Sequence, residues 1–131
     1  MRMGEVTIGG RAWPLCLSTR VMVALEERGR AEGKGVDDAL RGIMADSSVS
    51  GAFWLLAQMM DAAARVCRRE GHPLDADPPT YDELLDTVGV DEYGSMFSAL
   101  TSAVQIGEAQ EVQAEFPPEK GKNGEPTQAV Q

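Results

Sequence analysis

The chain has 131 residues, a length that fits a single domain. Hydrophobic residues make up 43% and charged residues 25%, which is typical of globular proteins and excludes a chain that is disordered, fibrous or membrane-embedded as a whole. The formal net charge of −9 argues against a general binder of nucleic acid or anionic membranes, because such proteins neutralise phosphates with clustered Lys and Arg.

Residues 5–17 predict a β-hairpin at the start of the chain. Two short β-type runs flank Gly9 and Gly10, and a Gly pair fits a two-residue turn because both positions need a positive φ. Pro14 has no N–H to donate, so we expect the second strand to lie at an edge or to be bulged. A hairpin is marginal alone and must pack on helices. Alternation places five apolar side chains inward: Val6, Ile8, Trp13, Leu15 and Leu17.

Apolar periodicity and capping residues predict helices over most of the remaining chain. The longest, capped by Ser47 and Ser48 and running to about Glu70, carries an apolar stripe on one side and is expected to be the central core helix. Thr80 and Glu83 predict a capping box. The expected segments run from Ser18-Thr19 to Gly29 or Gly33, then Val36–Met44, the long helix, Tyr81–Val88, and about Asp91 to Phe116.

Together these elements predict a mainly α fold of the α+β type, with the hairpin packed on a bundle of about four to five helices. Residues 1–116 are expected to form the single domain. Residues 117–131 contain no aromatic residue and only one large aliphatic residue, Val130. This segment cannot bury enough apolar surface to fold, so we expect a disordered, flexible tail.

Charge is distributed unevenly along the chain. Residues 1–69 hold ten Lys or Arg and eight Asp or Glu, whereas residues 70–119 hold twelve Asp or Glu and no Lys or Arg. The acidic half serves solubility in the simplest interpretation. The alternatives are that it meets a basic partner or is held by the basic end of the long helix, which carries Arg65, Arg68 and Arg69.

No motif predicts catalysis, a cofactor or a metal. The segment of residues 29–35 lacks the spacing of a phosphate loop and the Ser or Thr that should follow its Lys. His72 precedes a proline with no nucleophile arranged near it, and the acidic residues of 75–83 lack the central Gly of a calcium loop. Cys16 and Cys67 are expected to be core thiols of a protein in a reducing compartment. The chain is therefore expected to act through surfaces and not as an enzyme.

The opening segment, VTIGGRAWPLCLSTRVMVALEER (residues 6–28), resembles the small tail assembly chaperones of long-tailed bacteriophages and prophages. Those proteins often begin with a hairpin of the form I-x-G-K/R-x-Y/W-x-L that leads into a helix. The later order is similar too, with a TYDELL helix at residues 80–85, a break, a last amphipathic helix and a polar tail. The resemblance in the order of elements covers about residues 5–116.

This resemblance implies a non-enzymatic protein that works in the host cytoplasm. Such chaperones coat the long tape measure protein, are thought to recruit tail tube subunits, and are absent from the finished virion. No nucleic acid, membrane or cofactor is expected as a partner, and self-association into a homo-oligomer stays open. The alternative from another class is a small acidic regulatory adaptor or inhibitor that binds a basic protein partner, for example by mimicking DNA.

A chaperone of this kind needs an adaptable apolar groove, and methionine side chains suit varied partners. For every candidate the alternative is ordinary core packing. Because Phe53, Trp54, Leu55 and Leu56 are consecutive on a helix, they cannot all face one core, and Trp54 is the side chain we expect to be left for a partner. The candidate partner-binding residues are Trp54, Phe53, Met22, Met44, Met59, Met60 and Met96.

Overall fold

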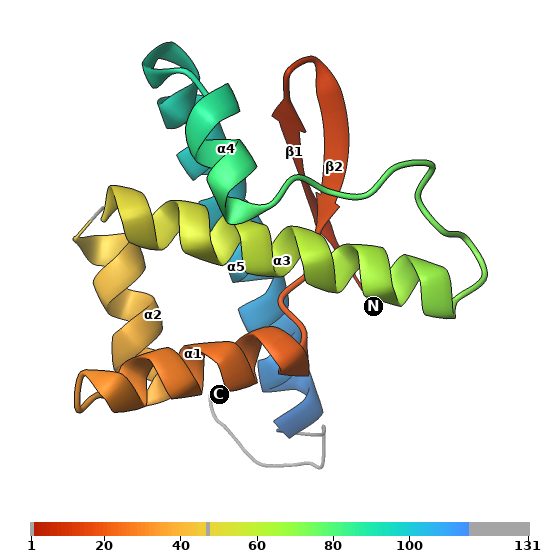
Figure 1. Cartoon of the computed structure of the whole chain (residues 1–131). Helices are drawn as coiled ribbons and strands as arrows, with labels where there is room; N and C mark the ends of the chain where they lie inside the picture. The colour runs from red at the N-terminus through yellow and green to blue at the C-terminus, as the bar shows by residue number, and fades with distance from the viewer. Residues whose placement is uncertain (1, 47, 116–131) are drawn as a thin grey trace, which may run out of the picture.

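The computed structural model describes residues 2–46 and 48–115 (Figure 1). It confirms the mainly α fold with an N-terminal hairpin packed on helices. The tail expected at residues 117–131, and the domain boundary at residue 116, lie outside the described residues. The elements are β1 (Gly4–Ile8), β2 (Arg11–Leu15), α1 (Thr19–Ala31), α2 (Val36–Ala45), α3 (Val49–Arg69), α4 (Tyr81–Thr87), the 3-10 helix η1 (Val90–Glu92) and α5 (Tyr93–Glu115).

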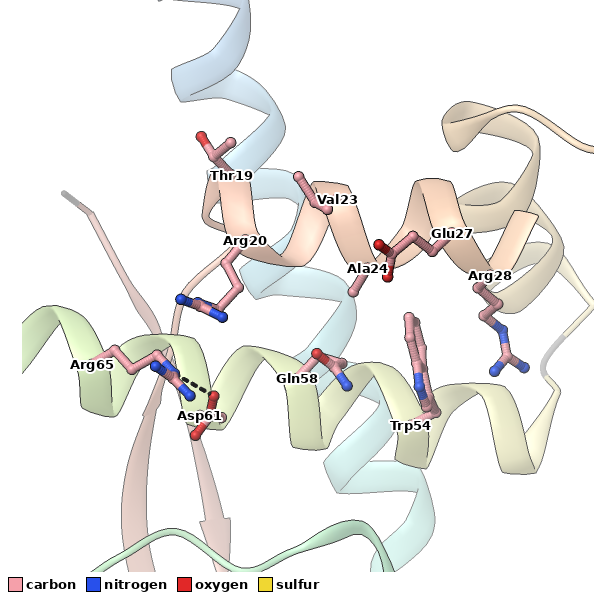
Figure 2. A pocket seen from close by; sticks show the side chains of 10 residues that line it. All are labelled: Thr19, Arg20, Val23, Ala24, Glu27, Arg28, Trp54, Gln58, Asp61 and Arg65. Atoms are coloured by element: carbon pink, nitrogen blue, oxygen red, sulfur yellow. Dashed lines mark hydrogen bonds and ion pairs between the residues drawn. The ribbon is translucent and has the colours of Figure 1, made fainter. Parts of the chain in front are cut away.

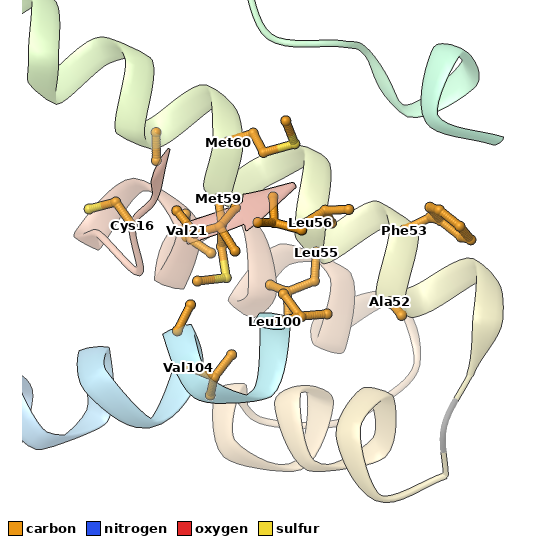
Figure 3. Packing of buried hydrophobic residues seen from close by; sticks show 14 of the residues in the cluster. Cys16, Val21, Ala52, Phe53, Leu55, Leu56, Met59, Met60, Leu100 and Val104 are labelled. Carbon is orange, nitrogen blue, oxygen red and sulfur yellow. The ribbon is translucent and has the colours of Figure 1, made fainter. Parts of the chain in front are cut away.

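Helix α3 crosses the middle of the molecule, and α1, α2, α4, α5 and β2 all contact it (Figure 1). Leu55 and Met59 of α3 point toward Leu100 and Val104 of α5 (Figure 3). The predicted stripe on this helix, Phe53, Leu56, Met60, Ala63 and Cys67, is confirmed except at its end, where Cys67 is only partly buried. The largest fully buried side chains are Leu15, Leu25, Leu55, Leu56, Met59, Met60, Leu84, Met96, Leu100, Val21 and Cys16.

The hairpin forms as the Gly pair predicts. Gly9 and Gly10 have φ angles of 59° and 80°, which places both in the left-handed region that side chains disfavour. The strands pair without a bulge, with Val6 opposite Trp13, and Pro14 lies on an edge strand as expected. Strand β1 packs on α5 and β2 packs on α3. Packing on two helices therefore stabilises a two-stranded hairpin that would be marginally stable alone.

The helix ends follow their caps, with one difference. Ser48 Oγ accepts a hydrogen bond from the Gly51 N–H at 3.1 Å, and the capping box of Thr80 and Glu83 is present. Of the two predicted ends of the first helix, Gly29 lies inside α1, which continues to Ala31, and Gly33, with a φ of 74°, follows the C-cap residue Glu32. Gly29 instead lies against residues 34–39, where an added Cβ would come within 2.8 Å of the Lys34 carbonyl oxygen.

Two other glycines let α5 approach the N-terminal segment, and no sequence pattern indicated them. A Cβ on Gly4 would lie 2.6 Å from Cβ of Ala103, and a Cβ on Gly107 would lie even closer to Cβ of Leu17. Both distances are far shorter than van der Waals contact. The last helix can therefore lie against the hairpin and its exit only because side chains are missing at these two positions.

We predict that Gly107→Ala destabilises the fold by about 1–3 kcal/mol, since Leu17 or α5 must move to admit the methyl group. Gly94→Ala is the matched control on the same helix, because nothing lies within 4 Å of its added Cβ. It should be neutral or stabilise by up to about 1 kcal/mol through helix propensity. Urea unfolding followed by circular dichroism measures both changes, and equal effects of the two substitutions would contradict the close approach.

The two cysteines should differ in reactivity. Cys16 is 1% exposed, and burial raises the pKa of its thiol above the usual 9.0, whereas Cys67 is partly exposed. The thiolate is the reactive form. At neutral pH we expect an alkylating reagent to modify Cys67 roughly tenfold faster than Cys16, or more. Mass spectrometry of the native protein and of Cys67→Ser gives the two rates. Equal rates before unfolding would place Cys16 outside the core.

Candidate interaction surface between helices α1 and α3

An open cavity of about 880 Å³ lies between α1 and α3 (Figure 2). Helix α1 forms one wall and α3 the other, and the indole of Trp54 stands from α3 toward α1. We call this cavity the Trp54 groove. Its lining residues are Thr19, Arg20, Val23, Ala24, Glu27, Arg28, Trp54, Gln58, Asp61 and Arg65.

Trp54 is the one large side chain of its run that the fold leaves partly exposed. Phe53, Leu55 and Leu56 are all buried, because one face of α3 packs on α4 and α5 and another on the hairpin. The guanidinium carbon of Arg28 lies 4.7 Å from the centroid of the Trp54 ring. This cation–π contact holds the indole upright in the groove.

The groove combines apolar and charged surface. Val23 is 46% exposed on the wall formed by α1. Opposite it, Arg65 Nε donates a hydrogen bond to Asp61 Oδ2 at 2.8 Å, and about half of each of these two side chains is exposed. Such a surface offers an aromatic anchor and polar groups around it, which is the usual composition of a protein-binding patch.

The groove continues into a second cavity of about 550 Å³ toward the C-terminal end of α3. Four arginines line it, which we call the arginine cluster, and no acidic residue does. Among the described residues, Arg20, Arg68 and Arg69 form no ion pair. Trp54 and Arg68 are about 21 Å apart along the helix axis, so the two parts are separable. The arginine cluster consists of Arg20, Arg65, Arg68 and Arg69.

The structure separates the seven candidate residues into two groups. Trp54, Met22 and Met44 are partly exposed, but Met22 and Met44 line other cavities, around the start of α2 and between α2 and α5. The expectation of a single methionine-lined groove is therefore wrong. The remaining four candidates pack inside the domain, because they lie on the inward faces of α3 and α5. These four are Phe53, Met59, Met60 and Met96.

Within the part of the chain that the structure describes, no acidic residue of the acidic half forms an ion pair with the basic end of α3. One ion pair among the described residues joins the two halves of the chain, between Arg11 and Asp75, and Arg11 also lies over the Trp13 ring at 4.4 Å. This pair fastens the loop of residues 72–79 to the hairpin. The acidic residues of α4 and η1 have no basic partner among the described residues.

Other candidate chemistry is sparse within residues 2–46 and 48–115. His72 is exposed, and these ranges contain no group of three His, Cys, Asp or Glu placed to hold a metal ion. The helices within them are too short or too polar to span a bilayer. The Tyr93 hydroxyl is buried and has no hydrogen-bond partner in this part of the chain, and desolvation by burial raises its pKa above the usual 10.0.

Comparisons of this chain with models of protein families, with curated proteins and with solved structures find no match.

The buried Tyr93 hydroxyl predicts a particular dependence of stability on pH. Because the pKa of Tyr93 is higher in the folded chain than in the unfolded chain, its ionisation disfavours the folded state. The free energy of unfolding is unaffected below pH 10 and falls as the pH rises through the folded-state pKa. Tyr93→Phe should keep or raise stability at neutral pH and weaken the loss at alkaline pH. Urea unfolding at neutral and at alkaline pH measures the free energy of unfolding of each variant, with Tyr81→Phe as the control. Identical alkaline losses in Tyr93→Phe and the unmodified chain would contradict it.

Proposed function

We propose that this chain is a tail assembly chaperone of a long-tailed bacteriophage or prophage, acting in the host cytoplasm on the tape measure protein and helping to recruit tail tube subunits. The observation that carries the proposal is the resemblance of residues 6–28 to the opening of these chaperones. In support, this segment has the corresponding order of a hairpin followed by a helix. The helix is α1, one wall of the Trp54 groove.

The Trp54 groove supplies a mechanism for shielding a helical client. A long helical protein that waits for its tube exposes apolar faces, and such faces aggregate. A helix laid between α1 and α3 would place its apolar face against Trp54 and Val23. Because the groove is open and mostly polar, the affinity at each contact is modest and release stays possible.

The second candidate function is an acidic adaptor or inhibitor of a basic protein. It is favoured by the acidic residues of α4 and η1, which have no basic partner among the described residues. Such a surface would act through charge and depend strongly on salt. The two functions therefore use different faces of the molecule, and substitutions can separate them.

The experiment is co-expression of the chain with a tape measure fragment, followed by centrifugation to measure how much of the fragment stays soluble. Trp54→Ala should lower the soluble fraction severalfold, because large aromatic anchors dominate the energy of such contacts. Val23→Glu places a charge on the opposite wall and should act similarly without touching the core. Val49→Ala, at an exposed site of α3 outside the groove, is the matched control.

Three results would contradict the proposal. The unmodified chain could leave the fragment insoluble, or both groove variants could solubilise it fully. Displacement of a DNA-binding protein from its site by the chain, abolished by replacing acids of α4 and η1, would favour the adaptor instead.

A further inference from the structure

We propose that the arginine cluster binds the acidic end of a second copy of this chain, so that copies associate head to tail. The acidic end is the exposed surface of α4 and η1. It consists of Asp82, Leu85, Asp86, Val90, Asp91 and Glu92. This inference goes beyond the proposed function and does not rest on it.

The arginine cluster forms a positively charged cavity that an acidic partner from outside could neutralise. Arg65, Arg68 and Arg69 fall at i, i+3 and i+4 on α3, so they share one face, and Arg20 of α1 faces them across the cavity. Only Arg65 has an acidic partner among the described residues. Like charges this close repel one another, and carboxylates entering the cavity would relieve that repulsion and form paired hydrogen bonds.

The acidic end of the molecule matches this cavity in charge and adds apolar contact. Val90 is 96% exposed and Leu85 is 44% exposed, so both offer apolar surface to a partner. Acidic residues flank both, and residues 70–119 contain no Lys or Arg to neutralise them. The cavity offers the partly exposed Val66 beside its arginines. An interface with an apolar centre and a charged rim is the expected result.

The two surfaces cannot meet within one copy. Helix α1 packs on one side of α3 and α4 packs on another, so that in Figure 1 α1 lies below α3 and α4 stands above it. A contact that joins different surfaces of two identical chains is heterologous, and it generates a ring or an open filament and not a closed symmetric dimer. The same charges limit the alternative of nucleic acid in the cavity, because the net charge of −9 repels phosphates.

Sedimentation velocity of the full chain tests this association. At about 0.02 M salt the average mass should rise with protein concentration beyond that of a monomer, and at about 0.5 M salt it should fall back, because exposed pairs are screened. The double substitution Arg68→Glu and Arg69→Glu should weaken association roughly tenfold or more. Asp86→Lys with Asp91→Lys should do the same from the other side.

The decisive arm mixes the two charge-reversed proteins, each of which has lost one surface. The mixture should associate again, because the intact acidic end of the first fits the intact arginine cluster of the second. Arg30→Glu with Arg41→Glu is the matched control, since it makes the same change in net charge outside the cavity and should leave association unchanged. Trp54→Ala should also associate normally, which separates this inference from the chaperone proposal.

Several results would overturn the inference. A chain that stays monomeric at low salt and high concentration has no such interface. Association that survives both reversals, or that the control weakens equally, uses another surface. Tight binding of a duplex oligonucleotide, lost in Arg68→Glu with Arg69→Glu, would assign the cluster to nucleic acid.

Discussion

The structure depends on the burial of one long helix by nearly every other element. The apolar stripe of helix α3 is widened by neighbouring apolar residues, and α1, α2, α4, α5 and the second strand each cover part of it. Aromatic residues are scarce, so aliphatic and Met side chains such as Leu55, Leu56, Met59 and Met60 do this filling. One face of α3 stays partly open beside α1, with Trp54 at one part and Arg65, Arg68 and Arg69 at the other, and both parts become candidate interaction surfaces for that reason.

The hairpin completes this core only because glycine allows close contact. Gly4 lies against Ala103, and Gly107 lies against Leu17, so α5 touches both β1 and the segment that leads into α1. The Cys16 N–H also donates to the Met59 carbonyl oxygen at 3.2 Å, which ties the exit of the hairpin to the middle of α3. The N-terminal motif and the two helices are therefore one packing unit, and the position of the α1 wall of the groove follows from it.

Local signals in the sequence were sufficient for most of the fold. The Gly9-Gly10 turn, the Thr80 capping box and the period of α3 depend on neighbouring residues, and all three are confirmed. The role of Gly29 was not visible, because its close neighbour Lys34 comes back to it only after a turn. In the candidate site, the partial exposure of Trp54 follows from helical geometry. Whether a Met lies inside depends on which helix covers it, and periodicity alone does not say that. The sequence shows the arginine cluster only as the basic end of a helix, because Arg20 joins it from α1 in the folded chain.

Folding of one copy leaves most of the charged side chains of the arginine cluster and the acidic end without an oppositely charged partner among the described residues. The core closes without a buried charged residue among the described positions, so its packing places no demand on where the charges go. Opposite charges that are kept apart by α3 contribute nothing to the stability of one copy, since each set faces water. These charges can still attract each other between molecules, where contact both removes water from them and pairs them. The separation of a basic cavity from an acidic end therefore favours association between copies and not the stability of one copy. Because α3 lies between the two surfaces, it also sets the geometry of that association.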